Sequence, residues 1–148
     1  MMDLWGDWPA DTPQLLFGLL LALVLGALIG LERALRKHPA GLHTSALVAL
    51  GSAAFVVAGT IAGDESGPAR VAGQVVTGVG FLCAGVILHQ GATVRGLNTA
   101  ATVWCCSAVG VLAGLGLNAW AVLAAVLVLV ANVVLHFFEH NLSETPDK

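Results

Sequence analysis

The sequence predicts an all-α membrane protein with five transmembrane helices. Hydrophobic residues fill 57% of its 148 positions, charged residues fill only 10%, and the mean hydropathy is +0.88. Soluble domains carry about 25% charged residues, so this chain lies outside the soluble class. Its apolar segments follow one another closely, which leaves no room for a separate soluble catalytic domain.

A helix that crosses a bilayer needs roughly 20 mainly apolar residues. Five segments meet this requirement: 14–32, 45–62, 71–89, 100–117 and 119–138. Before the first, Thr12 can cap the helix and Pro13 suits its first turn. The acidic N-terminus has no basic region of the kind that opens a signal peptide, so cleavage is not expected.

The charges of the connections predict an orientation. The link after the first span carries Arg33, Arg36 and Lys37, and the link after the third carries Arg95. The link after the second span is mainly acidic. Because positive residues favour the cytoplasm, residues 1–13 are expected outside and the tail 139–148 inside.

An internal repeat links the first four spans. A shift of 55 residues lays 41–59 over 96–114 with identity at ten of nineteen positions, including a shared GL(H/N)T block. The first and second spans and the third and fourth then form two copies of one helical hairpin, a parallel repeat with the fifth helix outside it. We expect the two GL(H/N)T steps to face each other on the cytoplasmic side.

Small residues recur at four-residue spacing, as in Ala22, Gly26 and Gly30 of the first span. Such residues let helix backbones approach in lipid, so tight helix packing accounts for nearly all of the glycines. The three cysteines lie in apolar segments without metal-ligand spacing and are expected to be packed, reduced thiols.

Polar side chains in the hydrocarbon zone need partners. Gln74, Thr77 and Asn132 are therefore expected to face the bundle. Arg33 can extend to the lipid headgroups. Glu32 is either neutralised by Arg95 or Arg33, or stays a solvated interfacial acid.

Thr44, Asn98 and Thr99 stand at the predicted starts of the second and fourth spans. Their side-chain oxygens can cap the free backbone N–H groups there. The alternative is that the two helix N-termini, with the basic residues beside them, bind an anion or an anionic lipid headgroup.

Sequence motifs for catalysis are lacking, and no cofactor, metal or nucleic acid is expected. The string HFFEH at 136–140 matches the H-x-x-E-H zinc motif, but only eight residues follow it, too few to supply a distant third ligand.

Four blocks carry a resemblance that covers about residues 15–135: LVLGALIGLERALR, PAGLHTSALVALGSA, RVAGQVVTGVGFLCAGVIL and VRGLNTAATVWCCSAVG. Together and in this order they resemble the MgtC/SapB family of bacterial inner-membrane proteins. The resemblance implies a five-span inner-membrane protein linked to growth at low magnesium, to survival of pathogens inside host cells, and to phosphate and ATP balance. It also implies action through other membrane proteins, notably the F-type ATP synthase.

The family resemblance marks Asn98 and Cys105 as functional residues, since they match the Asn and first Cys of GLNTAATxWC. This sequence departs from the longer members, which continue into a soluble C-terminal domain, and that puts the ATP-synthase role in doubt. It also has His43 where many members have Arg.

Two functions are compatible with the sequence. One is a non-enzymatic regulator that binds other membrane proteins, with a homo-oligomer left open. The other is a small transporter or channel subunit for Mg²⁺ or another ion. The mid-membrane polar groups are neutral, whereas transport sites usually hold ionisable groups, and this favours the regulator. The candidate functional residues are Glu32, Arg33, Thr44, Gln74, Arg95, Asn98, Thr99 and Cys105.

Overall fold

The computed structural model describes residues 11–38, 40–62, 66–90 and 93–143, and within these it contains five α-helices and one β-hairpin. The helices are α1 (Thr12–Leu35), α2 (Leu42–Ile61), α3 (Gly67–Val86), α4 (Leu97–Gly114) and α5 (Asn118–Ser143). All five are long and apolar enough to span a membrane. The predicted all-α class with five spans is confirmed.

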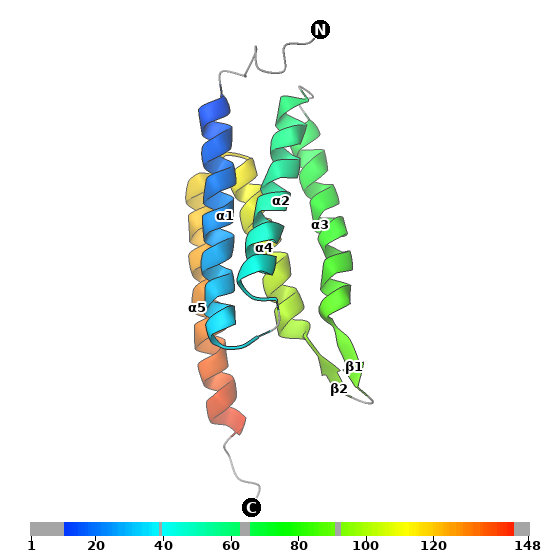
Figure 1. Cartoon of the computed structure of the whole chain (residues 1–148), viewed down its shortest axis with the longest axis vertical. Coiled ribbons are helices and arrows are strands. Elements are labelled where there is room, and N and C mark those ends of the chain that lie inside the picture. The colour runs from blue at the N-terminus through cyan, green and yellow to red at the C-terminus, as the bar shows by residue number, and fades with distance from the viewer. Residues whose placement is uncertain (1–10, 39, 63–65, 91–92, 144–148) are drawn as a thin grey trace, which may run out of the picture.

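The helices lie along one long axis, with α3 and α5 on opposite sides of the bundle (Figure 1). Strands β1 (Leu88–Gln90) and β2 (Thr93–Arg95) form an antiparallel pair in which Leu88 lies opposite Arg95. This hairpin joins α3 to α4 at the end of the bundle where α1 ends and α2 begins (Figure 1). We call this end the hairpin end.

The third predicted span was too long at its C-terminal end. Helix α3 ends at Val86, Ile87 is extended, and β1 follows, whereas helix was predicted to residue 89. The chain leaves β2 through Gly96, whose φ of +92° is one that glycine adopts without strain. A Cβ there would also collide with the Val86 carbonyl oxygen, so α4 can begin at Leu97 only because residue 96 is glycine.

The predicted threonine caps are wrong. The residues that precede α2 and α4 are Gly41 and Gly96, and neither helix start has a side-chain capping hydrogen bond. The helices therefore begin three residues earlier than predicted, which places Thr44 and Thr99 inside the first turn. At the start of α1, Asp11 rather than Thr12 holds the capping position, and this start also has no side-chain capping hydrogen bond.

Helix α1 packs closely on α2 and α4 through its glycines. A Cβ at Gly26 would lie 2.7 Å from the Ala49 Cβ, and one at Gly18 would lie 2.5 Å from the Ala113 carbonyl oxygen. The main core joins α1, α2, α4 and α5, and its buried residues are Ala22, Leu25, Ile29, Ala53, Cys106, Val109, Ala113, Ala121 and Ala125. These contacts agree with the prediction that small residues allow close helix packing.

Helix α3 does not follow that rule. Of the most apolar 18-residue stretch of α3, only 11% is buried, against 56% for α4. The helix packs through a smaller cluster of Val75, Val79 and Val103, the last of which lies on α4. Nothing lies within 4 Å of a Cβ built at its inner glycines Gly73, Gly78, Gly80 and Gly85. The expectation that nearly all glycines serve packing is therefore wrong for α3 within this chain.

The proposed repeat relates α2 to α4, and these helices meet at one pair of equivalent residues. Ser52 and Ser107, which are 55 positions apart, have their hydroxyl oxygens 2.9 Å apart. Ser52 donates its single proton to the Val48 carbonyl at 2.7 Å, so Ser107 is the donor between the two serines. The symmetry of the two hairpins, and the facing of the two GL(H/N)T steps, stay predictions.

Candidate functional site

A buried arginine connects α1 to α4. Arg33 is only 2% exposed. Its Nη1 donates to Thr102 Oγ1 at 3.0 Å and its Nη2 to Thr99 Oγ1 at 2.6 Å. The prediction that Arg33 extends to the headgroups is wrong. Arg33 follows Gly30 by three positions and so lies on the face of α1 that packs against the other helices.

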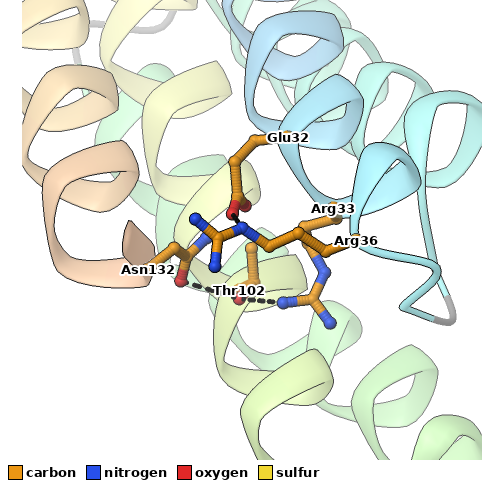
Figure 2. A network of polar contacts seen from close by, with 5 residues as sticks. All are labelled: Glu32, Arg33, Arg36, Thr102 and Asn132. Atoms are coloured by element: carbon orange, nitrogen blue, oxygen red, sulfur yellow. Dashed lines mark hydrogen bonds and ion pairs between the residues drawn. The ribbon is translucent and has the colours of Figure 1, made fainter. Parts of the chain in front are cut away.

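Thr102 extends the connection to α5. It donates to the Asn98 carbonyl oxygen at 3.0 Å and also lies 3.5 Å from Asn132 Oδ1. One hydroxyl has one proton, so the shorter bond to Asn98 is the stronger of the two. Figure 2 shows Asn132 facing this group from α5. Asn132 thus meets the bundle interior, as predicted.

The acid beside Arg33 is paired at the C-terminal end of its own helix. Glu32 Oε1 lies 2.5 Å from Nε of Arg36, the residue that directly follows α1, and the two form an ion pair without the alignment of a hydrogen bond. Of the two predicted partners, Arg95 lies exposed on β2 and Arg33 bonds to the threonines. Arg36 is the residue that forms an ion pair with Glu32, and Arg33, one of the two predicted partners, interacts electrostatically with the same carboxylate. We refer to the whole group as the polar cluster: Glu32, Arg33, Arg36, Thr99, Thr102 and Asn132.

The structure brings together three of the eight candidate residues, Glu32, Arg33 and Thr99. Asn98 is exposed and contributes its backbone carbonyl alone to the cluster, while Cys105 is half-buried. Thr44 and Arg95 are exposed. The cysteines are free thiols.

Gln74 lies outside the cluster, on α3. It is exposed and lines a groove of about 570 Å³ between α2 and α3, together with residues such as Leu47, Phe55, Val75 and Gly78. Thr77 is also exposed and donates to the Gly73 carbonyl of its own helix at 3.3 Å. The prediction that both side chains face the bundle is wrong, because α3 contacts the other helices along a narrow strip.

Sequence reasoning missed the roles of Thr102 and Arg36. The signal was present: Thr99 and Thr102 are three positions apart, which places them on one face of a helix, and Glu32 and Arg36 have the four-residue spacing of a helical ion pair. Reading Arg33 on the same face as Gly26 and Gly30 would have predicted its burial.

A metal centre has no support in the described part of the chain, where no three His, Cys, Asp or Glu residues come together. The HFFEH string lies largely outside this test, since the side chains of His136, Glu139 and His140 are not among those described.

Five apolar helices, with a buried arginine on α1 bonded to two threonines of α4, define an α-helical, multi-pass membrane protein. The family model described as the MgtC family matches residues 19–141. The chain belongs to the MgtC family, and the resemblance seen in its sequence is confirmed.

Its relatives include two proteins called Protein MgtC. The one from Salmonella typhimurium is 47% identical over 88% of this chain and 56% of its own length, and the one from Brucella abortus is 53% identical over 77% and 48%. A protein of Synechocystis described as uncharacterized is 52% identical over 81% of this chain and 51% of its own length. The chain thus spans about half the length of these relatives. No solved structure matches it.

Proposed function

We propose that this protein is a non-enzymatic regulator of the bacterial inner membrane that acts by binding other membrane proteins. Family membership supports a role in adaptation to low magnesium or in phosphate and ATP homeostasis. The F-type ATP synthase is a candidate partner by family resemblance. The observation that carries the proposal is the exposed surface of α3 and the groove beside it.

The groove has the chemistry of a helix-binding surface rather than that of an ion path. Its walls are almost wholly apolar, with Gln74 and Ser52 as the polar side chains among its lining residues. Among these residues Gly78 on α3 leaves open space where another backbone could approach closely, and Gly73 and Gly85 do the same elsewhere on this helix. Since lipid tails are as apolar as leucine, such close approach is what favours one helix over lipid.

The alternative, transport of Mg²⁺, needs several hard oxygen ligands. In the described part of helices α1–α4, Glu32 is the only carboxylate, and it pairs with Arg36. This arrangement favours the regulator.

Crosslinking from the groove tests the proposal. A photoreactive residue at Gly78 is expected to capture a membrane protein in the native membrane, identified by mass spectrometry after purification. The matched control is Val130, which is 51% exposed on α5, on the other side of the bundle. Equal capture from both positions, or none from Gly78, contradicts a docking role for the groove.

A flux assay separates the two functions. We expect purified protein in liposomes to give no saturable Mg²⁺ uptake above empty vesicles, and robust uptake would overturn the regulator in favour of the transporter.

The proposed orientation has the N-terminus outside and the hairpin end in the cytoplasm. Cysteine substitutions at Val94 on β2 and at Leu117 between α4 and α5 lie at opposite ends of the bundle. In a background where the native cysteines are replaced, a membrane-impermeant maleimide added to intact spheroplasts should label Leu117→Cys and spare Val94→Cys. The reverse pattern inverts the topology.

A further inference from the structure

Gln74 carries an amide group that the bundle does not satisfy. It is exposed on α3, which begins at Gly67, and the amide has no hydrogen-bond partner among the described residues. At a rise of about 1.5 Å per residue, Gln74 lies roughly 10 Å inside a helix about 30 Å long. An amide at this depth faces hydrocarbon and costs free energy until another polar group satisfies it.

Gln74 shares one side of α3 with Gly78, Phe81 and Gly85, and we call these four residues the Gln74 stripe. They follow one another at intervals of four, three and four residues, which aligns them along the helix. Gln74 and Gly78 also line the α2–α3 groove, so the stripe borders that groove. Nothing lies within 4 Å of a Cβ built at Gly78 or Gly85, and Phe81 between them is 83% exposed. A protruding ring between two open glycines is a surface that can interlock with another helix.

Helix α5 provides a comparison within the same chain. The most apolar 18-residue stretches of α3 and α5 are equally little buried, at 11%. On α5 the large exposed residues from Val122 to Leu135 are all valine or leucine, which suit contact with lipid tails. The Gln74 stripe instead presents an amide and two glycines, which gain little from lipid. The difference indicates that another helix covers α3.

A second copy of this chain supplies the group that the amide needs. An amide is both a donor and an acceptor, so two Gln74 side chains can donate to each other. Two copies inserted in the same direction pair about a two-fold axis along the membrane normal, which brings equivalent residues to the same depth. The Gln74 side chains of the two copies therefore meet when their α3 helices pair.

We propose that two copies of this chain associate through the Gln74 stripe, with each α3 lying at the mouth of the other copy's α2–α3 groove. The two Gln74 amides hydrogen-bond to each other, and Phe81 of each copy occupies the space over the glycines of the other. This inference rests on the docking role of α3 in the proposed function and names a second copy as one protein that docks there.

Disulfide crosslinking in native membranes tests the geometry. In a background without the native cysteines, Gly78→Cys and Gly85→Cys should each form a covalent dimer on mild oxidation, because equivalent positions meet at the two-fold axis. Val76→Cys is the matched control, since Val76 is 49% exposed on the same helix and lines a separate groove with Trp104 of α4. Equal crosslinking from Val76→Cys, or none from either glycine position, overturns the proposal.

The amide is tested through the dimer dissociation constant of the purified full chain in detergent, measured by energy transfer between labelled copies. Gln74→Leu should weaken association about tenfold, because both amide hydrogen bonds are lost, and Gln74→Asn, which keeps an amide, should weaken it less. Thr77→Val is the control and should change association less than twofold, since the Thr77 hydroxyl bonds to the Gly73 carbonyl of its own helix. Unchanged association in Gln74→Leu, or an equal loss in Thr77→Val, contradicts the amide pair.

Circular dichroism and gel filtration check that each variant is folded, and if Gln74→Leu is not, the crosslinking pattern decides. The outcomes also separate this inference from the proposed function. If a photoreactive residue at Gly78 captures a different membrane protein and the chain forms no dimer, the α3 pairing is overturned while the regulator stands. If Gly78 captures only a second copy, at twice the mass of the chain, the pairing stands and the groove loses its role in binding other proteins.

Discussion

Helices α1 and α3 open the two hairpins of the proposed repeat, and a shift of 55 residues lays Gly18 on Gly73 and Gly30 on Gly85. In α1 another helix packs against both glycines. Gly18 faces the Ala113 carbonyl of α4, and a Cβ built at Gly30 would lie 2.7 Å from the Leu42 Cα of α2. In α3 the same positions face open space.

The difference between α1 and α3 shows that a helix face of small residues packs closely only when the neighbouring helix also presents small residues to it. Gly26 meets Ser45, Ala46 and Ala49, which are themselves small. The groove wall across from α3 carries Leu47 and Phe55 instead, which are 63% and 66% exposed. Related sequence therefore produces one helix, α1, that packs closely on its neighbours and another, α3, that leaves most of its surface open.

The largest expected effect comes from filling the close contact between α1 and α2 at Gly26. Gly26→Val forces a side chain against the Ser45 carbonyl and the Ala49 side chain, and overpacking of this kind should lower the free energy of unfolding by about 3 kcal/mol. Gly78→Val makes the same change on the open face and should alter it by no more than about 0.5 kcal/mol. Reversible unfolding in SDS–detergent mixtures measures both. Similar losses from the two variants would contradict the distinction between the packed face of α1 and the open face of α3.

A smaller effect is expected at the buried arginine, which has no counterpart in the second hairpin because Leu88 holds the equivalent position. Arg33→Met removes two hydrogen bonds and leaves the Thr99 and Thr102 hydroxyl oxygens without the donors that they accept from. We expect a loss of about 2 kcal/mol in the same unfolding assay. Arg95→Met, on exposed β2, is the control and should be neutral. If Arg33→Met were as stable as the wild type or more stable, the cost of removing the guanidinium from water would equal or exceed the stabilisation from its hydrogen bonds.

The smallest effect is expected at the hydrogen bond between Ser52 of α2 and Ser107 of α4. Ser107→Ala removes the proton that Ser107 donates to Ser52 and should cost about 1 kcal/mol. Thr77→Ala removes a hydroxyl that bonds only within its own helix and should fall within about 0.5 kcal/mol of the wild type. If the two variants are indistinguishable, the Ser52–Ser107 bond does not stabilise the α2–α4 contact.

The five spans could be predicted because each satisfies the length and apolarity that a bilayer demands. The β-hairpin could not be predicted, because Leu88 continues an apolar segment in which no residue signals that α3 ends at Val86. The helix starts were misplaced because threonine is a common capping residue, while the actual starts depend on backbone angles at Gly41 and Gly96.

The candidate site was only partly predictable. The residues near Glu32 and Arg33 could be named, but their partners depend on which helices become neighbours, and Arg33 and Thr99 are 66 positions apart. Gln74 was misplaced because a polar side chain in a span was assumed to need the interior, whereas α3 exposes most of its surface. The roles of Asn98 and Cys105 rest on family resemblance and stay predictions.

The long separation between Arg33 and its threonines has a consequence for biogenesis. The α1–α2 pair can close as soon as α2 has entered the bilayer, but Thr99 leaves the ribosome 66 residues after Arg33. At a synthesis rate of roughly 5–20 residues per second, that delay lasts on the order of several seconds. During this delay the Arg33 guanidinium lacks its threonine partners, so it has to stay hydrated at the edge of the nascent membrane domain. It becomes buried when α4 packs against α1.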